Sequence, residues 1–379
     1  MLKARMESAQ TAHQAFLRTK TFGALDGLRA LAIFAVVLYH VLEAREGLVG
    51  RFYLSVSLFF AISGFLITTL LLRERAQTGT ISLKGFYARR SLRIFPLYYA
   101  VTALYIVLVS VFETDMVVRG AFFDNVKYYL TYTSNWFINL EEGRIIFYFA
   151  WSMATEEQFY LLWPFVVRYF KSTWGPVVFM SGMLAVGIFM GWATKTGFLD
   201  TRHLWVRILA SISISVCMGC LSAYLVHFPK PFAWTWKVLG QVWSVPVMVV
   251  LVFLAIYNYN TPLWLSSLLL TLMVLAMCIR PHHVMAPLID HKWLRYVGSI
   301  TYGIYLMHMI SLNIVRRVVP HNLALYYVLT LALSIFFATL SYRYFEKPFL
   351  KLKDRFDWRG KKPVAEAPQP VVSTPVNPG

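Results

Sequence analysis

Charged residues are scarce in this chain. Asp, Glu, Lys and Arg make up only 14% of its 379 residues, whereas soluble domains carry roughly a quarter. Hydrophobic residues make up 58%, and the mean hydropathy is +0.57. A helix needs about 20 mostly apolar residues to cross a bilayer, and the chain has many such runs. The composition therefore argues against a soluble protein and predicts an integral membrane protein.

Cysteine is also rare, and the few cysteines lie in apolar runs. Cys217 and Cys220 have the spacing of a redox motif, but packing inside a helix is the simpler interpretation. No small-residue cleavage site follows the first apolar run, so we expect an uncleaved first helix. The sequence shows no long internal repeat and no second soluble domain. We predict no metal site and no permanently bound cofactor.

Basic residues outnumber acidic ones and give a net charge of +18. They lie between the apolar runs rather than in one basic domain, which argues against nucleic acid as a partner. If the N-terminus is cytoplasmic, the segments on its side hold 25 Lys and Arg residues and the opposite segments hold 10. Cytoplasmic loops of membrane proteins are enriched in Lys and Arg. We therefore predict that both termini are cytoplasmic.

The apolar runs predict an all-α fold, namely a polytopic transmembrane helix bundle of about ten spans. The predicted spans are 25–42, 52–72, 94–112, 145–167, 172–194, 208–229, two within 238–279, 296–315 and 318–342. The run 238–279 is divided by the turn-forming residues 258–262. The predicted organisation is a cytoplasmic segment 1–22, a membrane domain 23–350, and a basic, Pro-rich disordered tail 351–379.

Ionisable residues inside the first span are the first functional candidates, because a charge in the bilayer is costly unless it is paired or faces a cavity. Arg29 and His40 are separated by about 16 Å of helical rise, which places His40 deep in the bundle. Histidine transfers protons readily near neutral pH. Glu43 lies one turn beyond His40 on the same face. An inert histidine bonded to a neighbouring helix is the alternative interpretation.

Two further charged segments accompany this helix. Glu156 and Glu157 lie within a predicted span and point about 100° apart, so at least one should face a polar interior or a buried cation. Arg89, Arg90 and Arg93 lie before the third span, and arginine binds phosphate in a bidentate manner. A plain membrane-orientation signal is the alternative for the arginines. For His308, also within a span, and for Tyr302 we favour hydrogen bonds to other helices.

Six segments of the chain, in order, resemble the motifs of the acyltransferase 3 family of membrane acyltransferases. They are residues 29–40, 57–68, 89–99, 151–164, 301–308 and 341–348. One departure is Ser55-Val56-Ser57, where the family often has Gly-Val-Asp. Some members carry an additional periplasmic hydrolase-like domain, and this chain resembles the stand-alone type.

The resemblance implies that a multi-pass protein of the bacterial cytoplasmic (inner) membrane transfers an acyl group, usually acetyl from acetyl-CoA, to a hydroxyl of a sugar. The implied acceptors are surface polysaccharides or their precursors, lipid-linked glycans and glycosylated small molecules. It implies that His40 is the essential catalytic residue with Arg29 as its partner, and that Arg90 and Arg93 hold the phosphates of the donor. The expected partners are membrane lipids, acyl-CoA and a carbohydrate or glycolipid acceptor.

Our mechanistic hypothesis places the donor nucleotide on the arginines 89, 90 and 93. His40 acts as general base, or takes the acyl group itself, and Glu43 or a mid-span glutamate orients its ring. Further candidates for contacts with the substrate or the oxyanion are Ser57, Ser63, Trp151, Tyr302 and His308. A non-enzymatic transporter or flippase of a glycan or lipid is the alternative function, because buried charges also suit transport.

Overall fold

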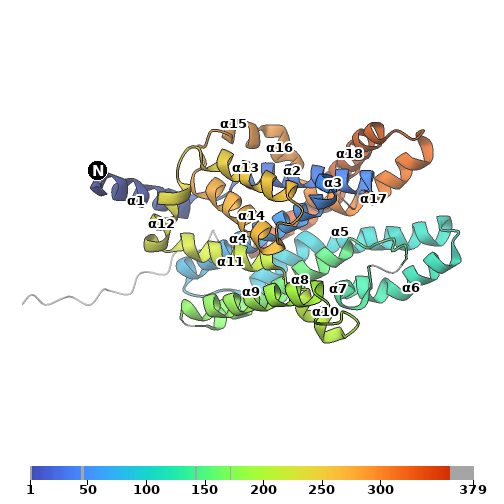
Figure 1. Cartoon of the computed structure of the whole chain (residues 1–379), viewed down its shortest axis with the longest axis horizontal. Helices are drawn as coiled ribbons and strands as arrows, with labels where there is room; N and C mark the ends of the chain where they lie inside the picture. Colours follow the sequence, from blue (N-terminus) through green and yellow to red (C-terminus); the bar gives the residue numbers. More distant parts are fainter. Residues whose placement is uncertain (1, 44–46, 141–142, 171, 359–379) are drawn as a thin grey trace, which may run out of the picture.

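The computed structural model describes residues 2–43, 47–140, 143–170 and 172–358, and these residues form helices without any β-strand. The long helices run along the longest axis of the molecule (Figure 1). They are α2 (Gly23–Leu42), α4 (Leu54–Thr78), α5 (Leu83–Phe112), α8 (Ala150–Tyr169), α9 (Trp174–Lys195), α17 (Thr301–Val318) and α18 (Leu323–Leu340). This agrees with the predicted all-α class.

Shorter helices complete the bundle. They are α1 (Leu2–Arg18), α3 (Gly47–Gly50), α6 (Met116–Leu130), α7 (Ser134–Phe137), α10 (Leu204–Ala210), α11 (Ile214–His227), α12 (Pro229–Leu239), α13 (Ser244–Tyr257), α14 (Leu263–Ile279), α15 (Ala286–Ile289), α16 (Lys292–Ser299) and α19 (Lys347–Lys353). Single turns η1 (Arg51–Tyr53) and η3 (Asp354–Phe356) and a wider turn η2 (Ser341–Glu346) connect some of them.

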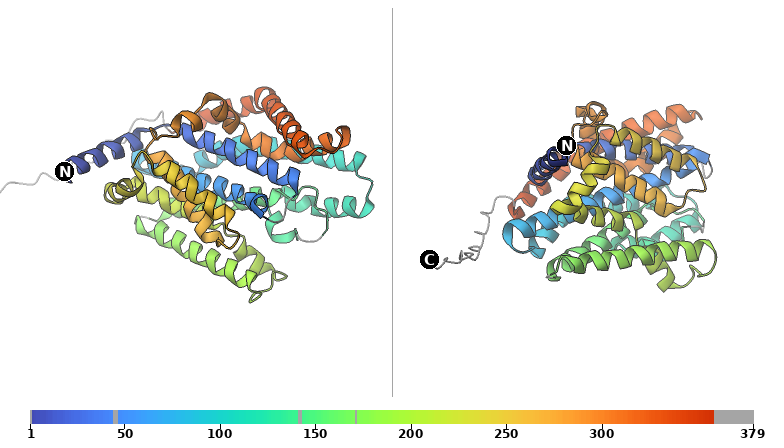
Figure 2. Two further views of the ribbon diagram at one scale, coloured as in Figure 1. Left: turned by 45° about the horizontal axis from the view of Figure 1, so that its top comes forward. Right: turned by 60° about the vertical axis from the view of Figure 1, so that its left-hand side comes forward.

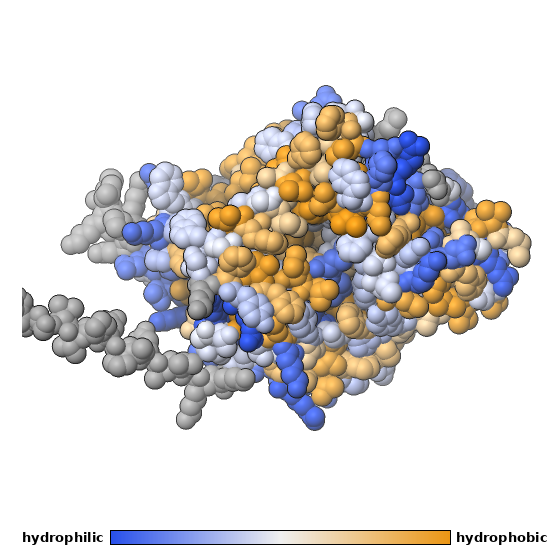
Figure 3. All heavy atoms as spheres, turned by 90° about the horizontal axis from the view of Figure 1, so that it is seen from below, coloured by the Kyte–Doolittle hydropathy of each residue, from blue (hydrophilic) through white to orange (hydrophobic). Residues whose placement is uncertain are grey.

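Six helical segments in the described part of the chain are long and apolar enough to cross a membrane. A seventh is possible if α12 and α13, which meet at 75°, form one broken span. Helices occupy most of each predicted span, but residues 145–149 precede α8, residues 211–213 separate α10 from α11 within the span 208–229, and α18 begins only at Leu323. The helix α14 has only 17 residues, and α8 carries two glutamates. Apolar side chains cover much of the middle of the face drawn in Figure 3. The chain is thus a multi-pass membrane protein, and ten spans stay a prediction.

The helices α4 and α11 pack closely against each other through glycines. A Cβ atom at Gly64 would collide with the carbonyl of Val216, and one at Gly219 with the carbonyl of Ala61. Small residues let membrane helices approach in this way. This contact fixes α4, and α4 carries Ser57 and Ser63 to the interior of the bundle.

The glycine contact gives a first prediction. Gly219→Leu should lower the melting temperature of the detergent-solubilised protein, because overpacking costs about 1–3 kcal/mol. Gly182→Leu is the matched control, since a Cβ atom at Gly182 of α9 meets nothing within 4 Å. Equal melting temperatures for the two variants would contradict the glycine contact.

Both described ends of the chain lie at one end of the bundle. Arg73, near the end of α4, donates to the carbonyls of Phe16 in the last turn of α1 and of Thr19 just after it. Arg89 of α5 donates to the carbonyl of Phe356 in η3 at 2.7 Å. Residues 73 and 89 flank the same short loop, so the chain ends are held side by side, with α1 projecting outward (Figures 1 and 2). Their position on the cytoplasmic side stays a prediction.

The two terminal segments contain more structure than the sequence indicated. Residues 2–18 form α1, which packs its His13 ring on Phe232 of α12. At the other end, helical structure continues through α19 and η3 to Phe356, within the segment predicted to be disordered. The bond from Arg89 to Phe356 accounts for this order, and sequence composition does not reveal such a partner. Residues 359–379 lie outside the described residues.

Candidate active site

A cavity of about 160 Å³ lies inside the bundle, bounded by α2, α4, α5, α8, α16 and α17. We call it the arginine cavity because Arg29, Arg90 and Arg93 all line it. Ser63 and Glu156 also line it, as do Tyr160, Tyr302, Tyr305 and Ser152. The fold therefore brings together charged residues from α2, α5 and α8 that are up to 127 positions apart in the sequence.

Arg90 is the cation that neutralises the two adjacent glutamates of α8. Its Nη2 lies 3.2 Å from Glu156 and its Nε 3.7 Å from Glu157, and its guanidinium stacks on the ring of Tyr160 at 3.5 Å. Ser63 donates to Glu156 at 2.5 Å, and the Tyr160 hydroxyl bonds both groups. A buried carboxylate needs such partners. Glu156 lines the cavity, whereas Glu157 does not line it and contacts Arg90 instead.

Arg93 and Arg29 offer positive charge to the cavity. Arg93 lies one turn after Arg90 on α5 and is exposed to the cavity, and no carboxylate of the described residues pairs with it. Arg29 bonds Asp26 at 2.9 Å, one turn earlier on α2. A guanidinium has five N–H donors, so the bond to Asp26 leaves Arg29 with donors for a ligand.

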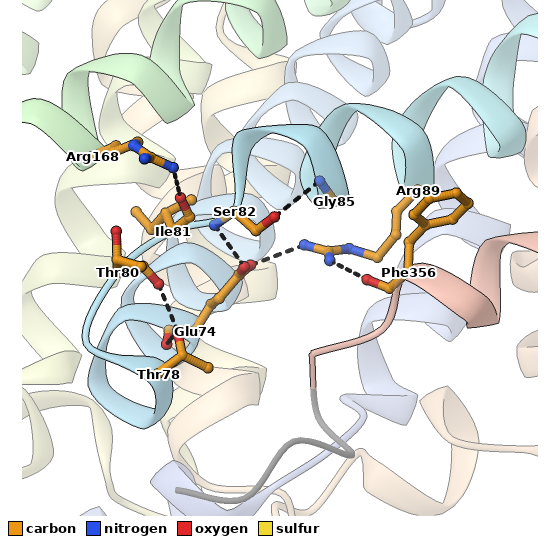
Figure 4. A network of polar contacts seen from close by, with 9 residues as sticks. All are labelled: Glu74, Thr78, Thr80, Ile81, Ser82, Gly85, Arg89, Arg168 and Phe356. Atoms are coloured by element: carbon orange, nitrogen blue, oxygen red, sulfur yellow. Dashed lines mark hydrogen bonds and ion pairs between the residues drawn. The ribbon is translucent and has the colours of Figure 1, made fainter. Parts of the chain in front are cut away.

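Arg89 faces a different set of partners. Its Nη2 lies 2.9 Å from Glu74, a buried carboxylate that also accepts from the backbone N–H of Ser82, while its Nη1 donates to Phe356 (Figure 4). Arg89 does not line the arginine cavity. These contacts give Arg89 a role in holding the loop and the chain end, and its predicted role in donor binding stays a prediction.

His40 lies at the end of α2 and bonds His308 of α17. The distance from His40 Nδ1 to His308 Nε2 is 3.0 Å, and His308 Nδ1 lies 2.5 Å from the carbonyl of Tyr305. A carbonyl only accepts, so His308 carries its proton on Nδ1 and, when neutral, accepts at Nε2. His40 must then donate from Nδ1. This tautomer, assigned from the hydrogen bonds, leaves a lone pair on His40 Nε2, as a general base requires.

Two tyrosine rings also contact His40. Tyr39 and Tyr148 meet its ring edge to face at centroid distances of 5.1 and 5.5 Å. Glu43 instead pairs with Arg316 at 2.7 Å and is 68% exposed. The side chain that hydrogen-bonds His40 is His308, which agrees with the predicted bond from His308 to another helix, and Glu43 makes no such bond to His40 among the described residues.

His40 does not line the arginine cavity, and Tyr305 lies between the His40–His308 ring pair and that cavity. The backbone carbonyl of Tyr305 holds His308, while its hydroxyl lines the cavity and bonds Ser152 at 2.7 Å. Tyr302, one turn earlier, donates its hydroxyl to the carbonyl of Ile94 at 2.9 Å. Tyr305 and Ser152 thus close the end of the cavity nearest to His40.

Ser57 and Trp151 line a second, larger cavity of about 570 Å³ and do not touch the arginine cavity. Four groups near the site did not appear among the predicted residues: Ser152, Tyr148, Tyr160 and Tyr305. Helical spacing offered a signal for two of them. Tyr160 is four residues after Glu156, and Tyr305 is three residues before His308, which places each pair on one helix face.

Comparison with known proteins found a matching family model and several similar sequences. A family model described as an acyltransferase domain matches residues 22–343. Similar proteins include an inferred O-acetyltransferase of Staphylococcus aureus (strain COL), 29% identical over 86% of this chain and 57% of its own length. The peptidoglycan O-acetyltransferase OatA of Listeria monocytogenes is 28% identical over 89% of this chain and 59% of its own.

The O-acetyltransferase OatA of Staphylococcus aureus (strain NCTC 8325 / PS 47) is 26% identical over 86% of this chain and 57% of its own length. The chain thus spans less than three fifths of the curated relatives it matches. No solved structure matches it. The match over residues 22–343 covers most of the chain, and it identifies this protein as a member of the acyltransferase 3 family.

Proposed function

We propose that this protein is an O-acyltransferase of the bacterial inner membrane that moves an acetyl group from acetyl-CoA to a hydroxyl of a carbohydrate. The observation that carries the proposal is a histidine with a lone pair on Nε2, held by His308 and separated by Tyr305 from a cavity lined with arginines. The O-acetyltransferase names of three relatives favour acetyl over longer chains.

The donor enters the arginine cavity from the end of the bundle where the chain ends lie. Arg93 and Arg29 bind its phosphates, because a phosphate accepts charge-assisted hydrogen bonds from guanidinium groups. Arg90 contributes positive charge while it holds Glu156 and Glu157. The narrow arm of the donor carries its thioester toward Tyr305 and Ser152, whose hydroxyl pair must separate for the thioester to approach His40.

At His40 the acceptor hydroxyl loses its proton to Nε2, and its oxygen attacks the thioester carbonyl carbon. The tetrahedral intermediate collapses, the carbon–sulfur bond breaks, and the thiolate of CoA takes the proton back from the imidazolium. The products are an O-acetyl ester and CoA thiol. His308 stabilises the imidazolium, because its Nε2 accepts from His40 Nδ1 throughout the reaction.

Arg93→Ala and Arg29→Ala test donor binding. Each should raise the KM for acetyl-CoA by about 10- to 100-fold, since a hydrogen bond to a charged group contributes about 1.5–3 kcal/mol. Transfer of isotope-labelled acetyl by protein purified in nanodiscs measures it. Arg355→Ala, at an exposed arginine of η3 near the same end of the bundle, is the control. An unchanged KM in both cavity variants would reject the phosphate assignment, and a wild type that never cleaves acetyl-CoA would reject the function.

A further inference from the structure

The second cavity has the size of a ligand site and is not lined by Arg29, Arg90 or Arg93. Its volume of about 570 Å³ falls in the range of roughly 300–1,000 Å³ typical of small-molecule pockets. It lies among the first turns of α4, α7, α8, α10, α11 and the end of α9, elements that gather together in Figure 1. Along α4, residues 56–60 line this cavity and the arginine cavity continues to Leu70, so the second cavity lies toward the opposite end of the bundle.

Its lining combines aromatic rings with hydrogen-bond donors that have no partner. Trp151 and Tyr53 contribute ring surface, and within the described chain neither the Trp151 indole N–H nor the hydroxyls of Tyr53 and Ser57 make a hydrogen bond. Sugars present both apolar C–H faces and hydroxyl groups, and rings with polar tips match both. Hydroxyl and amide side chains such as Asn135 and Ser267 line the cavity together with apolar residues such as Leu140.

The charged residues that line this cavity are basic. Arg207 donates to the carbonyls of Thr201 at 2.7 Å and Trp136 at 3.4 Å, and no carboxylate of the described residues pairs with it. Arg202 at the rim is paired with Asp200. Among the described residues, no Asp or Glu lines the cavity. The cavity therefore suits a neutral or anionic ligand and disfavours a cationic one.

The first turn of α8 and the residues just before it lie between the second cavity, the arginine cavity and His40. Trp151 lines the second cavity, Ser152 lines the arginine cavity, and Tyr148 just before the helix contacts His40. Phe60 lines both cavities and meets Trp151 edge to face at 6.0 Å. A ligand in the second cavity is thus separated from the donor cavity by one pair of rings.

We propose that the second cavity is the acceptor site, and that it takes a neutral or anionic saccharide from the side of the membrane opposite the donor. The role of this cavity as acceptor site rests on the proposed function. Saccharide binding in the cavity can be measured on its own, without catalytic turnover. Trp151 and Tyr53 stack on the sugar, and Ser57 and Arg207 bind its hydroxyl or acidic groups.

A large side chain at Gly191 can be used to fill this cavity. Gly191 lines the cavity from α9, and a Cβ atom there meets nothing within 4 Å, so Gly191→Phe places a ring into the space without a backbone clash. Gly182 on the same helix is equally open and lines neither cavity, which makes Gly182→Phe the matched control. Melting temperatures of both variants check that they fold.

Saturation-transfer NMR on protein in nanodiscs measures binding of cellobiose, cellobiouronic acid and maltose 1-phosphate, with a glucosamine dimer as the cationic probe. We expect at least one neutral or acidic probe to bind the wild type and Gly182→Phe, and Gly191→Phe to lose that signal. The proposal is overturned if none of these probes binds the wild type, if Gly191→Phe binds as the control does, or if the cationic dimer binds best.

Acetyl-CoA cleavage in the same samples separates the two proposals. Gly182→Phe should cleave acetyl-CoA and transfer acetyl to a bound sugar as the wild type does, whereas Gly191→Phe should lose transfer to the sugar. A wild type that binds a sugar and never cleaves acetyl-CoA would reject the proposed function and leave the saccharide site standing.

Discussion

His40→Ala should abolish acetyl transfer almost completely, with kcat lower by about 10²- to 10⁴-fold, because general-base catalysis contributes that much. The structural reason is that His40 Nε2 carries a lone pair while Nδ1 is occupied by His308 at 3.0 Å. Labelled acetyl transfer by purified protein measures the loss. His203→Ala, at an exposed histidine that begins α10 without a side-chain cap, serves as the control. Full activity of a folded His40→Ala protein would eliminate the mechanism.

Variants of His308 test whether it positions His40. His308→Gln keeps an acceptor for the Nδ1 proton and should retain most of the turnover, whereas His308→Phe removes the acceptor and should lower kcat with little effect on the KM for acetyl-CoA. A purely structural role would instead lower the melting temperature and the amount of folded protein without distinguishing glutamine from phenylalanine in kcat. Equal kcat values for the two folded variants would remove His308 from the mechanism.

Arg90→Ala should destabilise the protein by about 3–5 kcal/mol, because it leaves two buried carboxylates without their cation. Arg90 reaches both Glu156 and Glu157 and stacks on Tyr160. The melting temperature in detergent should fall far more than in Arg355→Ala. A small effect on stability would show that the carboxylates do not depend on Arg90.

A compensated variant separates stability from donor binding at this residue. Arg90→Met combined with Glu156→Gln and Glu157→Gln removes the cation and both charges together, and buried ion clusters replaced in this way often regain stability. We expect the triple variant to fold better than Arg90→Ala. A triple variant as unstable as the single one would show that packing on Tyr160, rather than charge, makes Arg90 necessary.

The sequence alone determined the helical membrane bundle and most of the charged positions that line its interior. A run of about 20 apolar residues and the helical period are local properties, so a single segment such as 25–42 reveals both its span and the face of Arg29. The same local pattern indicated that at least one of Glu156 and Glu157 needs a buried cation or a polar interior.

Tertiary structure decided which of these groups meet. His40 and His308 are 268 residues apart, and Arg90 and Glu156 are 66 residues apart, so no local pattern could pair them. Arg89 and Arg93 stand four residues apart in one basic motif, yet Arg89 bonds Glu74 while Arg93 faces the cavity. The reason is that a helix fixes only the direction of each side chain, whereas the packing of neighbouring helices determines what lies there.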